Sequence, residues 1–304
     1  MKLGVMLRLG RVSNLPTVWT NVLAALALSG GLSLDSPLRS SSFPGSDFPG
    51  SHVVLLAAAF SLFYVGGMYL NDAFDRHIDA RERPQRPIPS GQVSATSVFT
   101  LGFLWLALGM ALLLHVAYHG GAGLPPAVLS GAALAACIVG YDVYHKQNPL
   151  SPILMGLCRV LVYIGVGCAV LGPLRSALLL GAGGLLCHLI GLTYAAKQEA
   201  LNRLSRAWPL WFLAAPLLYA ASLAPAQPLI WPFLLLTVAW DVYALRFLRS
   251  GPQRSVPQAI VRLIAGIALI DALSIAATGA FGWALVAVAL GLLTRLLQRY
   301  IPGT

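Results

Sequence analysis

The sequence predicts an all-α protein, a polytopic bundle of nine to ten helices that cross a membrane. Of its 304 residues, 58% are hydrophobic and only 10% are charged, and long apolar stretches recur from about residue 14 to residue 298. A single soluble core does not require so many separate apolar runs. A cleaved signal peptide explains the first run poorly, because no small-residue cleavage pattern follows it. We therefore expect residues 1–304 to form one membrane domain whose first apolar run is a retained helix.

Ten apolar windows are long enough, at roughly 17 to 25 residues, for a tilted helix to cross the hydrocarbon layer. They lie at about residues 13–33, 52–72, 96–116, 125–144, 151–172, 176–197, 208–224, 229–247, 258–277 and 280–298. Only Thr278 and Gly279 separate the last two windows, so ten helices and nine helices with a kinked or re-entrant end are both open. The segment 34–51 is rich in Ser, Pro and Gly, which is typical of a loop.

The positions of the basic residues predict the orientation of the chain. The net charge of +10 is compatible with nucleic-acid binding, but the 20 Lys and Arg cluster between apolar windows and on alternate sides of them. Such clusters mark cytoplasmic loops, and the opposite loops carry only Arg39 and Arg175. We therefore expect a protein of a bacterial cytoplasmic (inner) membrane, with both termini and every even-numbered loop in the cytoplasm and no nucleic-acid partner.

The end of the second apolar window is unusually acidic. Four of the ten Asp and Glu of the chain fall within eleven positions: Asp72, Asp75, Asp79 and Glu82. Spacings of three, four and seven residues place Asp72, Asp75 and Asp79 on one face of a helix. With Asn71 they would lie at its cytoplasmic C-terminal end, where the helix dipole already carries partial negative charge. This repulsion predicts that a cation lies beside them.

Two kinds of cation are open at this helix end. The arginines between residues 76 and 86 could pair with the carboxylates. Mg²⁺ is the other candidate, because carboxylate and amide oxygens are the ligands that it prefers. We favour Mg²⁺, since pairing with solvated arginines does not require aspartates in register with an apolar span. The sequence thus predicts Mg²⁺ bound by Asn71, Asp72, Asp75 and Asp79.

Two motifs in this region resemble those of a known family. Residues 71–79 are similar to the N-D-x-x-D-x-x-x-D pattern of the UbiA superfamily of intramembrane prenyltransferases, and residues 86–91 resemble its R-P-[LI]-P-S-G loop. Residues 141–146 and Arg159 resemble the family's stretch across helices four and five. The resemblance implies a helical bundle around a central cavity that opens near the cytoplasmic face. It also implies Mg²⁺-dependent transfer of a prenyl group from a prenyl diphosphate to a small or lipidic acceptor.

The resemblance assigns a role to each matching residue. Metal binding is expected of Asn71, Asp72, Asp75, Asp79 and Glu199, and catalysis of Asp72, Asp75, Lys146 and Lys197. Substrate binding is expected of Asn71, Arg86, Tyr141, Arg159, Tyr194, Arg203 and Asn14. These residue types suit prenyl transfer, because the departure of an allylic diphosphate requires cations that stabilise the leaving group.

The sequence departs from the family at the end of the sixth window. A second aspartate-rich motif is expected there, but residues 194–203 contain only one acidic residue, Glu199. Three interpretations are open: Glu199 and Asn202 hold one ion, Lys197 and Arg203 bind phosphate directly, or ordinary prenyl transfer has been lost. The Lys-Gln-Glu sequence at 197–199 and the chain's last six residues resemble a bacterial UbiA-like branch, the EboC-type proteins.

Other polar residues in apolar windows are compatible with both structural and functional roles. The segments 141–144 and 240–243, Tyr-Asp-Val-Tyr and Trp-Asp-Val-Tyr, indicate a duplicated helical unit, and for both aspartates structural and functional roles are open. Asp271 and His188 are isolated in the sequence. Two other functions also stay open: a membrane terpene cyclase that uses the same aspartates, and a non-catalytic isoprenoid-binding bundle.

Overall fold

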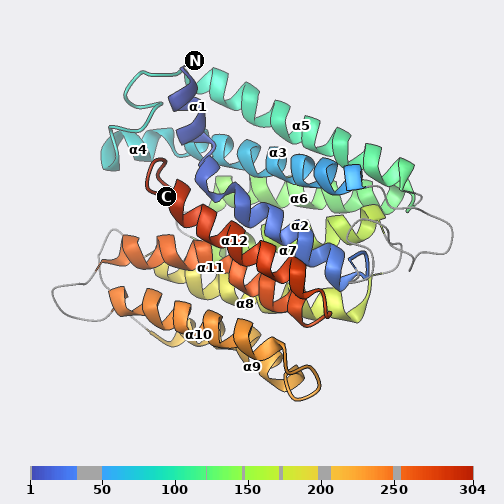
Figure 1. Ribbon diagram of the computed structural model, residues 1–304. Coiled ribbons are helices and arrows are strands. Elements are labelled where there is room, and N and C mark those ends of the chain that lie inside the picture. The colour runs from blue at the N-terminus through green and yellow to red at the C-terminus, as the bar shows by residue number, and fades with distance from the viewer. Residues whose placement is uncertain are drawn as a thin grey trace.

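The computed structural model describes residues 2–32, 50–120, 122–145, 148–170, 174–197, 207–248 and 255–303. These residues form a bundle of helices and contain no strand (Figure 1). The predicted all-helical bundle is confirmed. The elements are α1 Leu3–Leu9, η1 Val12–Asn14, α2 Leu15–Leu28, α3 Gly50–Phe74, α4 Arg76–Glu82, α5 Ala95–His119, α6 Leu124–Tyr144, α7 Ser151–Val170, α8 Ser176–Ala196, η3 Trp208–Leu213, α9 Ala214–Leu223, α10 Ile230–Leu245, η4 Arg246–Leu248, α11 Val256–Ala276 and α12 Phe281–Leu297.

Each of the ten apolar windows contains a helix. In the described part of the chain, seven helical segments are long and apolar enough to cross a membrane, and three more, Val12–Leu28, Trp208–Leu223 and Phe281–Leu297, are apolar but shorter. The last two windows are separate helices, because the chain turns at Gly279, whose φ of +85° is a left-handed conformation that glycine adopts readily. Prolines at 209 and 216 accompany the division of the seventh window into η3 and α9.

The described residues of segments that are predicted to share one side of the membrane lie together at one end of the bundle. Both chain ends, α4 and the end of α3 gather there in Figure 1. Arg8 donates to Gln92 Oε1 over 2.7 Å, and Lys197 Nζ donates to the Asn148 carbonyl over 2.7 Å. At the opposite end Arg175 packs against the Gly30 turn. These contacts agree with the expectation that successive loops lie on alternate sides of the membrane. The side of the membrane on which this end of the bundle lies stays a prediction.

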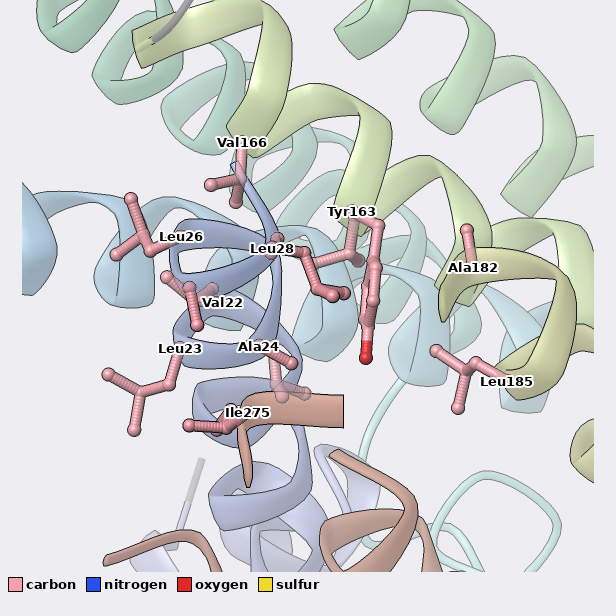
Figure 2. Packing of buried hydrophobic residues seen from close by; sticks show 14 of the residues in the cluster. Val22, Leu23, Ala24, Leu26, Leu28, Tyr163, Val166, Ala182, Leu185 and Ile275 are labelled. Atoms are coloured by element: carbon pink, nitrogen blue, oxygen red, sulfur yellow. The ribbon is translucent and has the colours of Figure 1, made fainter. Parts of the chain in front are cut away.

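Helices α2 and α11 form the centre of the bundle. Figure 2 shows Val22 and Leu26 of α2 beside Val166 of α7 and Ile275 of α11, all of them buried. On the outside, by contrast, α5, α6, α9, α10 and α12 expose large apolar side chains. Such an outer surface suits contact with lipid chains. The polar and charged groups that are buried must therefore find partners inside the bundle.

Helix α3 is held closely by α5. A Cβ atom at Gly66 would lie 2.8 Å from the Gly102 carbonyl oxygen, and one at Gly109 would lie 2.9 Å from the Ala59 carbonyl oxygen. Small residues let helix backbones approach in lipid, where packing replaces the hydrophobic effect as the driving force. This contact fixes the position of α3, whose last turn carries Asn71 and Asp72, the start of the acidic segment.

Candidate active site

The acidic segment is divided between two helices. Helix α3 ends at Phe74, α4 begins at Arg76, and Asp75 lies between them with φ −76° and ψ −5°. The prediction of one helix through Asp79 is therefore wrong. At the junction the backbone tightens, since the Ile78 N–H donates to the Asp75 carbonyl over 2.9 Å. The carboxylates nevertheless stay together, because other side chains bridge them.

Arg86 makes the main bridge. Its Nη1 donates to Asp72 Oδ1 over 3.1 Å and to Asp79 Oδ2 over 2.7 Å. The carboxylates of Asp72, Asp75 and Asp79 are all buried, and Asp79 is only 2% exposed. Burial raises the pKa of Asp79, and the Arg86 guanidinium opposes that increase. Arg86, which we predicted to bind substrate, thus neutralises two of the predicted metal ligands in this arrangement.

Arg11 is a second cation at this site. Its Nη2 donates to Asp72 Oδ1 over 3.2 Å and to Asn71 Oδ1 over 3.3 Å. Its backbone is left-handed, with φ +42°, and it is the one non-glycine residue with positive φ in the described part of the chain. Such strained conformations are found most often at functional sites. Arg11 was not predicted to belong to the site, because its only signal in the sequence is its charge before the first apolar window.

The end of α6 faces the end of α3. Asn71 Nδ2 donates to Asp142 Oδ1 over 3.1 Å, and His145 Nε2 lies 3.5 Å from Asp75 Oδ2. The ring of Tyr141 stacks on the His145 ring, with 4.8 Å between centroids. Tyr141 therefore lies next to the acidic end, as expected, and Asp142 and His145 join a site to which the sequence did not assign them.

The interior of the bundle holds a second polar group. Arg159 donates to Asn21 Oδ1 over 2.7 Å and to Thr17 Oγ1 over 3.1 Å, and its guanidinium lies over the Tyr64 ring, 5.3 Å from the centroid. Asn14 Nδ2 donates to the Tyr64 hydroxyl over 3.2 Å. The structure thus brings together two predicted substrate-binding residues, Asn14 and Arg159, through a tyrosine that the sequence did not indicate.

The C-terminal segment closes over Asn14. Asn14 Nδ2 also donates to the Gly303 carbonyl over 2.9 Å, and Gln298 Nε2 donates to Asn14 Oδ1 over 2.9 Å. Asn14 is 3% exposed. A Cβ atom at Gly303 would lie 2.9 Å from Asn14 Oδ1, so glycine permits the close approach.

Asp271 is the deepest carboxylate of this region. It is fully buried in α11 and accepts hydrogen bonds from Thr20 Oγ1, from Asn21 Nδ2 over 2.8 Å and from the Tyr163 hydroxyl over 2.6 Å. Asn21 links it to Arg159. Asp271 is isolated in the sequence, but in the structure it anchors a network across α2, α7 and α11.

The residues predicted at the end of the sixth window are only partly described. Tyr194 is half-buried in the last turn of α8. Lys197 is exposed, and through the Asn148 carbonyl it ties the end of α8 to the segment before α7. Lys146, Glu199 and Arg203 lie outside the described residues, as do Gln198 and Asn202.

The donor chemistry of the acidic end fits Mg²⁺. Asn71, Asp72, Asp75 and Asp142 present amide and carboxylate oxygens from two facing helix ends, and Asp142 Oδ2 has no hydrogen-bond partner in the described part of the chain. The described residues contain no ready group of three or more His, Cys, Asp or Glu side chains placed to hold a metal ion. Arg11 and Arg86 instead bind the carboxylate oxygens, so metal binding would require these arginines to move.

The chain matches the model of the UbiA prenyltransferase family over residues 16–264. It belongs to that family. The predicted superfamily is confirmed, and the acidic end of α3 lies inside the matching region.

Known proteins that resemble the chain include digeranylgeranylglyceryl phosphate synthases. The protein of Ignicoccus hospitalis is 34% identical over 146 residues, which are 48% of this chain and 39% of that protein. The protein of Methanopyrus kandleri is 42% identical over 64 residues, which are 20% of this chain and 24% of that protein. The chain thus spans less than half the length of these relatives, and neither of them supports the EboC-type branch.

Solved structures show the same fold for this UbiA-family chain. The structure of a digeranylgeranylglyceryl phosphate synthase superposes with a TM-score of 0.58 at 17% identity, over 94% of this chain and 99% of that one. A UbiA homologue from Archaeoglobus fulgidus bound to GPP and Mg²⁺ superposes with a TM-score of 0.51 at 14% identity, over 97% of each chain. At these identities the likeness concerns the fold alone.

Proposed function

We propose that this UbiA-family chain transfers a prenyl group from a prenyl diphosphate to an acceptor, with Mg²⁺ as its cofactor. The observation that carries this proposal is the buried end of α3. There the buried Asp72 lies beside the guanidinium groups of Arg11 and Arg86, and the buried Asp75 follows it three residues along the chain, beside His145. Carboxylates bind a divalent cation and arginines bind phosphate oxygens, so both kinds of group that a metal diphosphate needs are side by side.

The reaction places clear demands on these residues. When an allylic carbon–oxygen bond breaks, a carbocation forms and a multiply charged diphosphate leaves. Mg²⁺ held by Asn71, Asp72 and Asp75 would stabilise the leaving diphosphate as a Lewis acid. Arg11 and Arg86 would bind its oxygens, because a guanidinium presents its donors in a planar fork. The surrounding apolar helices would exclude water from the carbocation.

We assign the interior polar group to the substrates. Arg159 lies between α2 and the Tyr64 ring, and an arginine inside a membrane bundle is costly enough that it usually serves function. The digeranylgeranylglyceryl phosphate of the relatives' name is a glyceryl phosphate that carries isoprenoid chains. An isoprenoid glyceryl phosphate is therefore the first acceptor to test. The roles expected of Lys146, Tyr194, Lys197, Glu199 and Arg203 belong to the same proposal.

The test is prenyl transfer by the purified protein in lipid nanodiscs. A panel of prenyl diphosphates of increasing chain length is offered with Mg²⁺ and the acceptor, and pyrophosphate release and the lipid product are measured. Asp72→Ala and Asp75→Ala should each lower turnover by about 100-fold or more, as the loss of a main electrostatic stabiliser does. Chelation of Mg²⁺ by EDTA should stop the wild-type reaction.

Glu82→Gln is the matched control. Glu82 belongs to the same acidic stretch but is exposed on α4, so its replacement should leave turnover unchanged. Full turnover by Asp72→Ala or Asp75→Ala would refute the proposed role of the acidic end. A cyclised product formed without acceptor would instead identify a terpene cyclase.

A further inference from the structure

Asp142 has a carboxylate oxygen without a partner at the edge of the proposed active site. The residue is 4% exposed, in the last turn of α6. Its Oδ1 accepts a hydrogen bond from Asn71, but its Oδ2, which is fully buried, has no hydrogen-bond partner in the described part of the chain. A buried carboxylate oxygen that lacks a partner is costly. This oxygen therefore destabilises the fold unless a cation or a hydrogen-bond donor binds it.

The groups around Asp142 are mostly acidic. Asp75 and Asp72 both lie within electrostatic range of its carboxylate, and among the described residues the cation that interacts with it is Arg11. Arg11 also bonds to Asp72 and Asn71, so its charge is shared among several acceptors. His145, one turn further along, contacts Asp75 at 3.5 Å. Three carboxylates from two helix ends thus share few cations in the described part of the chain.

Asp142 differs from Asp72 of α3 and Asp79 of α4 in one respect. Asp72 Oδ1 already binds Arg11 and Arg86, and Asp79 Oδ2 already binds Arg86. A cation that binds these oxygens must displace an arginine. Asp142 Oδ2 needs no such displacement, because no protein donor occupies it among the described residues.

We propose that Asp142 is a further carboxylate ligand of the divalent cation that the acidic end of α3 binds. This inference rests on the proposed function. The end of α6 would add a third carboxylate to those of Asp72 and Asp75, with the Asn71 amide between them. The added ligand would offset the scarcity of acidic residues in 194–203, where the sequence provides only Glu199.

The test measures metal binding rather than turnover. Mn²⁺, which takes the same oxygen ligands as Mg²⁺, is titrated into the purified protein with inorganic pyrophosphate present, and free Mn²⁺ is followed by electron paramagnetic resonance. Asp142→Asn keeps the shape and the acceptor for Asn71 but removes the charge. It should weaken Mn²⁺ binding roughly 10-fold or more, the loss typical of a residue that supports a metal site.

Asp241→Asn is the matched control. Asp241 is also an aspartate near the end of its helix, is 4% exposed, and has two carboxylate oxygens without partners among the described residues, but it lies on α10 beside Gly266 of α11. Its replacement should leave Mn²⁺ binding unchanged. Thermal unfolding without metal shows whether each variant is folded, and Asp142→Ser replaces Asp142→Asn if the latter is not.

The outcomes separate the two proposals. If Asp72→Ala abolishes Mn²⁺ binding and folded Asp142→Asn or Asp142→Ser binds as the wild type does, the role of Asp142 is refuted and the metal site stands. If the wild type binds no Mn²⁺, the metal dependence of the proposed function and the role of Asp142 both fail. Equal weakening by Asp142→Asn and Asp241→Asn would also overturn the inference, since a general loss of buried charge would explain it.

Discussion

At the scale of single residues, Arg86 has the clearest energetic role. One of its nitrogen atoms bonds to two buried carboxylates, those of Asp72 and Asp79, which belong to different helices. Removing one partner of a buried ion pair is strongly destabilising, because the remaining charge stays buried without compensation. In this structure Arg86 therefore holds α4 against the end of α3.

Arg86→Gln should lower the free energy of unfolding by about 3 kcal/mol, as breaking a buried ion pair does. Arg86→Lys should recover only part of this loss, because an ammonium group lacks the guanidinium fork. The measurement is denaturant or thermal unfolding in detergent without divalent metal. Arg81→Gln is the control, since Arg81 is exposed on α4. Equal stability of Arg86→Gln and Arg81→Gln would contradict the bridging role.

At the scale of helices, a carboxylate joins three segments that are distant in sequence. Asp271 of α11 accepts hydrogen bonds from Thr20 and Asn21 of α2 and from Tyr163 of α7. Tyr163 lies between the apolar side chains of α2 and α8 in Figure 2. Without a hydrophobic effect between helices in lipid, such interhelical hydrogen bonds help to fix how the helices pack. The same network positions Asn21 beside Arg159.

Asp271→Ala should destabilise the bundle by about 1–3 kcal/mol for each buried donor that it leaves unsatisfied. Tyr163→Phe, which removes a single donor, should cost less. Thr237→Val is the matched control, because the Thr237 hydroxyl is buried but bonds only to the Phe233 carbonyl of its own helix in the described structure. Thermal unfolding in detergent measures the stability of the three variants relative to the wild type. A loss no larger for Asp271→Ala than for Thr237→Val would show that the network does not hold the helices together.

At the scale of the whole molecule, the described helices alternate in direction so that the end of α3, α4 and both chain ends share one end of the bundle (Figure 1). The positive-inside rule predicts that this end lies in the cytoplasm. Cysteine labelling tests this orientation in a background that lacks the four native cysteines. Arg175→Cys should react with an impermeant maleimide in intact cells, and Glu82→Cys only after permeabilisation.

Both labelling positions are exposed in the structure, so burial does not explain a difference between them. Labelling of Glu82→Cys in intact cells, with Arg175→Cys protected, would show the opposite orientation. The position of the active site at the cytoplasmic face would then be wrong as well.

The sequence predicted the helices well because apolar length is a local property, and it predicted the acidic motif because Asn71, Asp72 and Asp75 are neighbours in the chain. It did not predict their partners. Arg11 bonds to Asp72 across 61 residues, Asn71 to Asp142 across 71, and Thr20 to Asp271 across 251. Such contacts depend on how the helices pack, and a single sequence carries no periodic signal for them.

The contact between Asn14 and Gly303 spans 289 residues and has a consequence for biogenesis. Asn14 enters the membrane with the first apolar helix, but Gln298 and Gly303 are made only after α12. During synthesis the Asn14 amide therefore cannot form its hydrogen bonds to Gln298 and Gly303 until these residues have been made. The hydrogen bonds that hold Asn14 beside Tyr64 are therefore complete only after α12 has been synthesised.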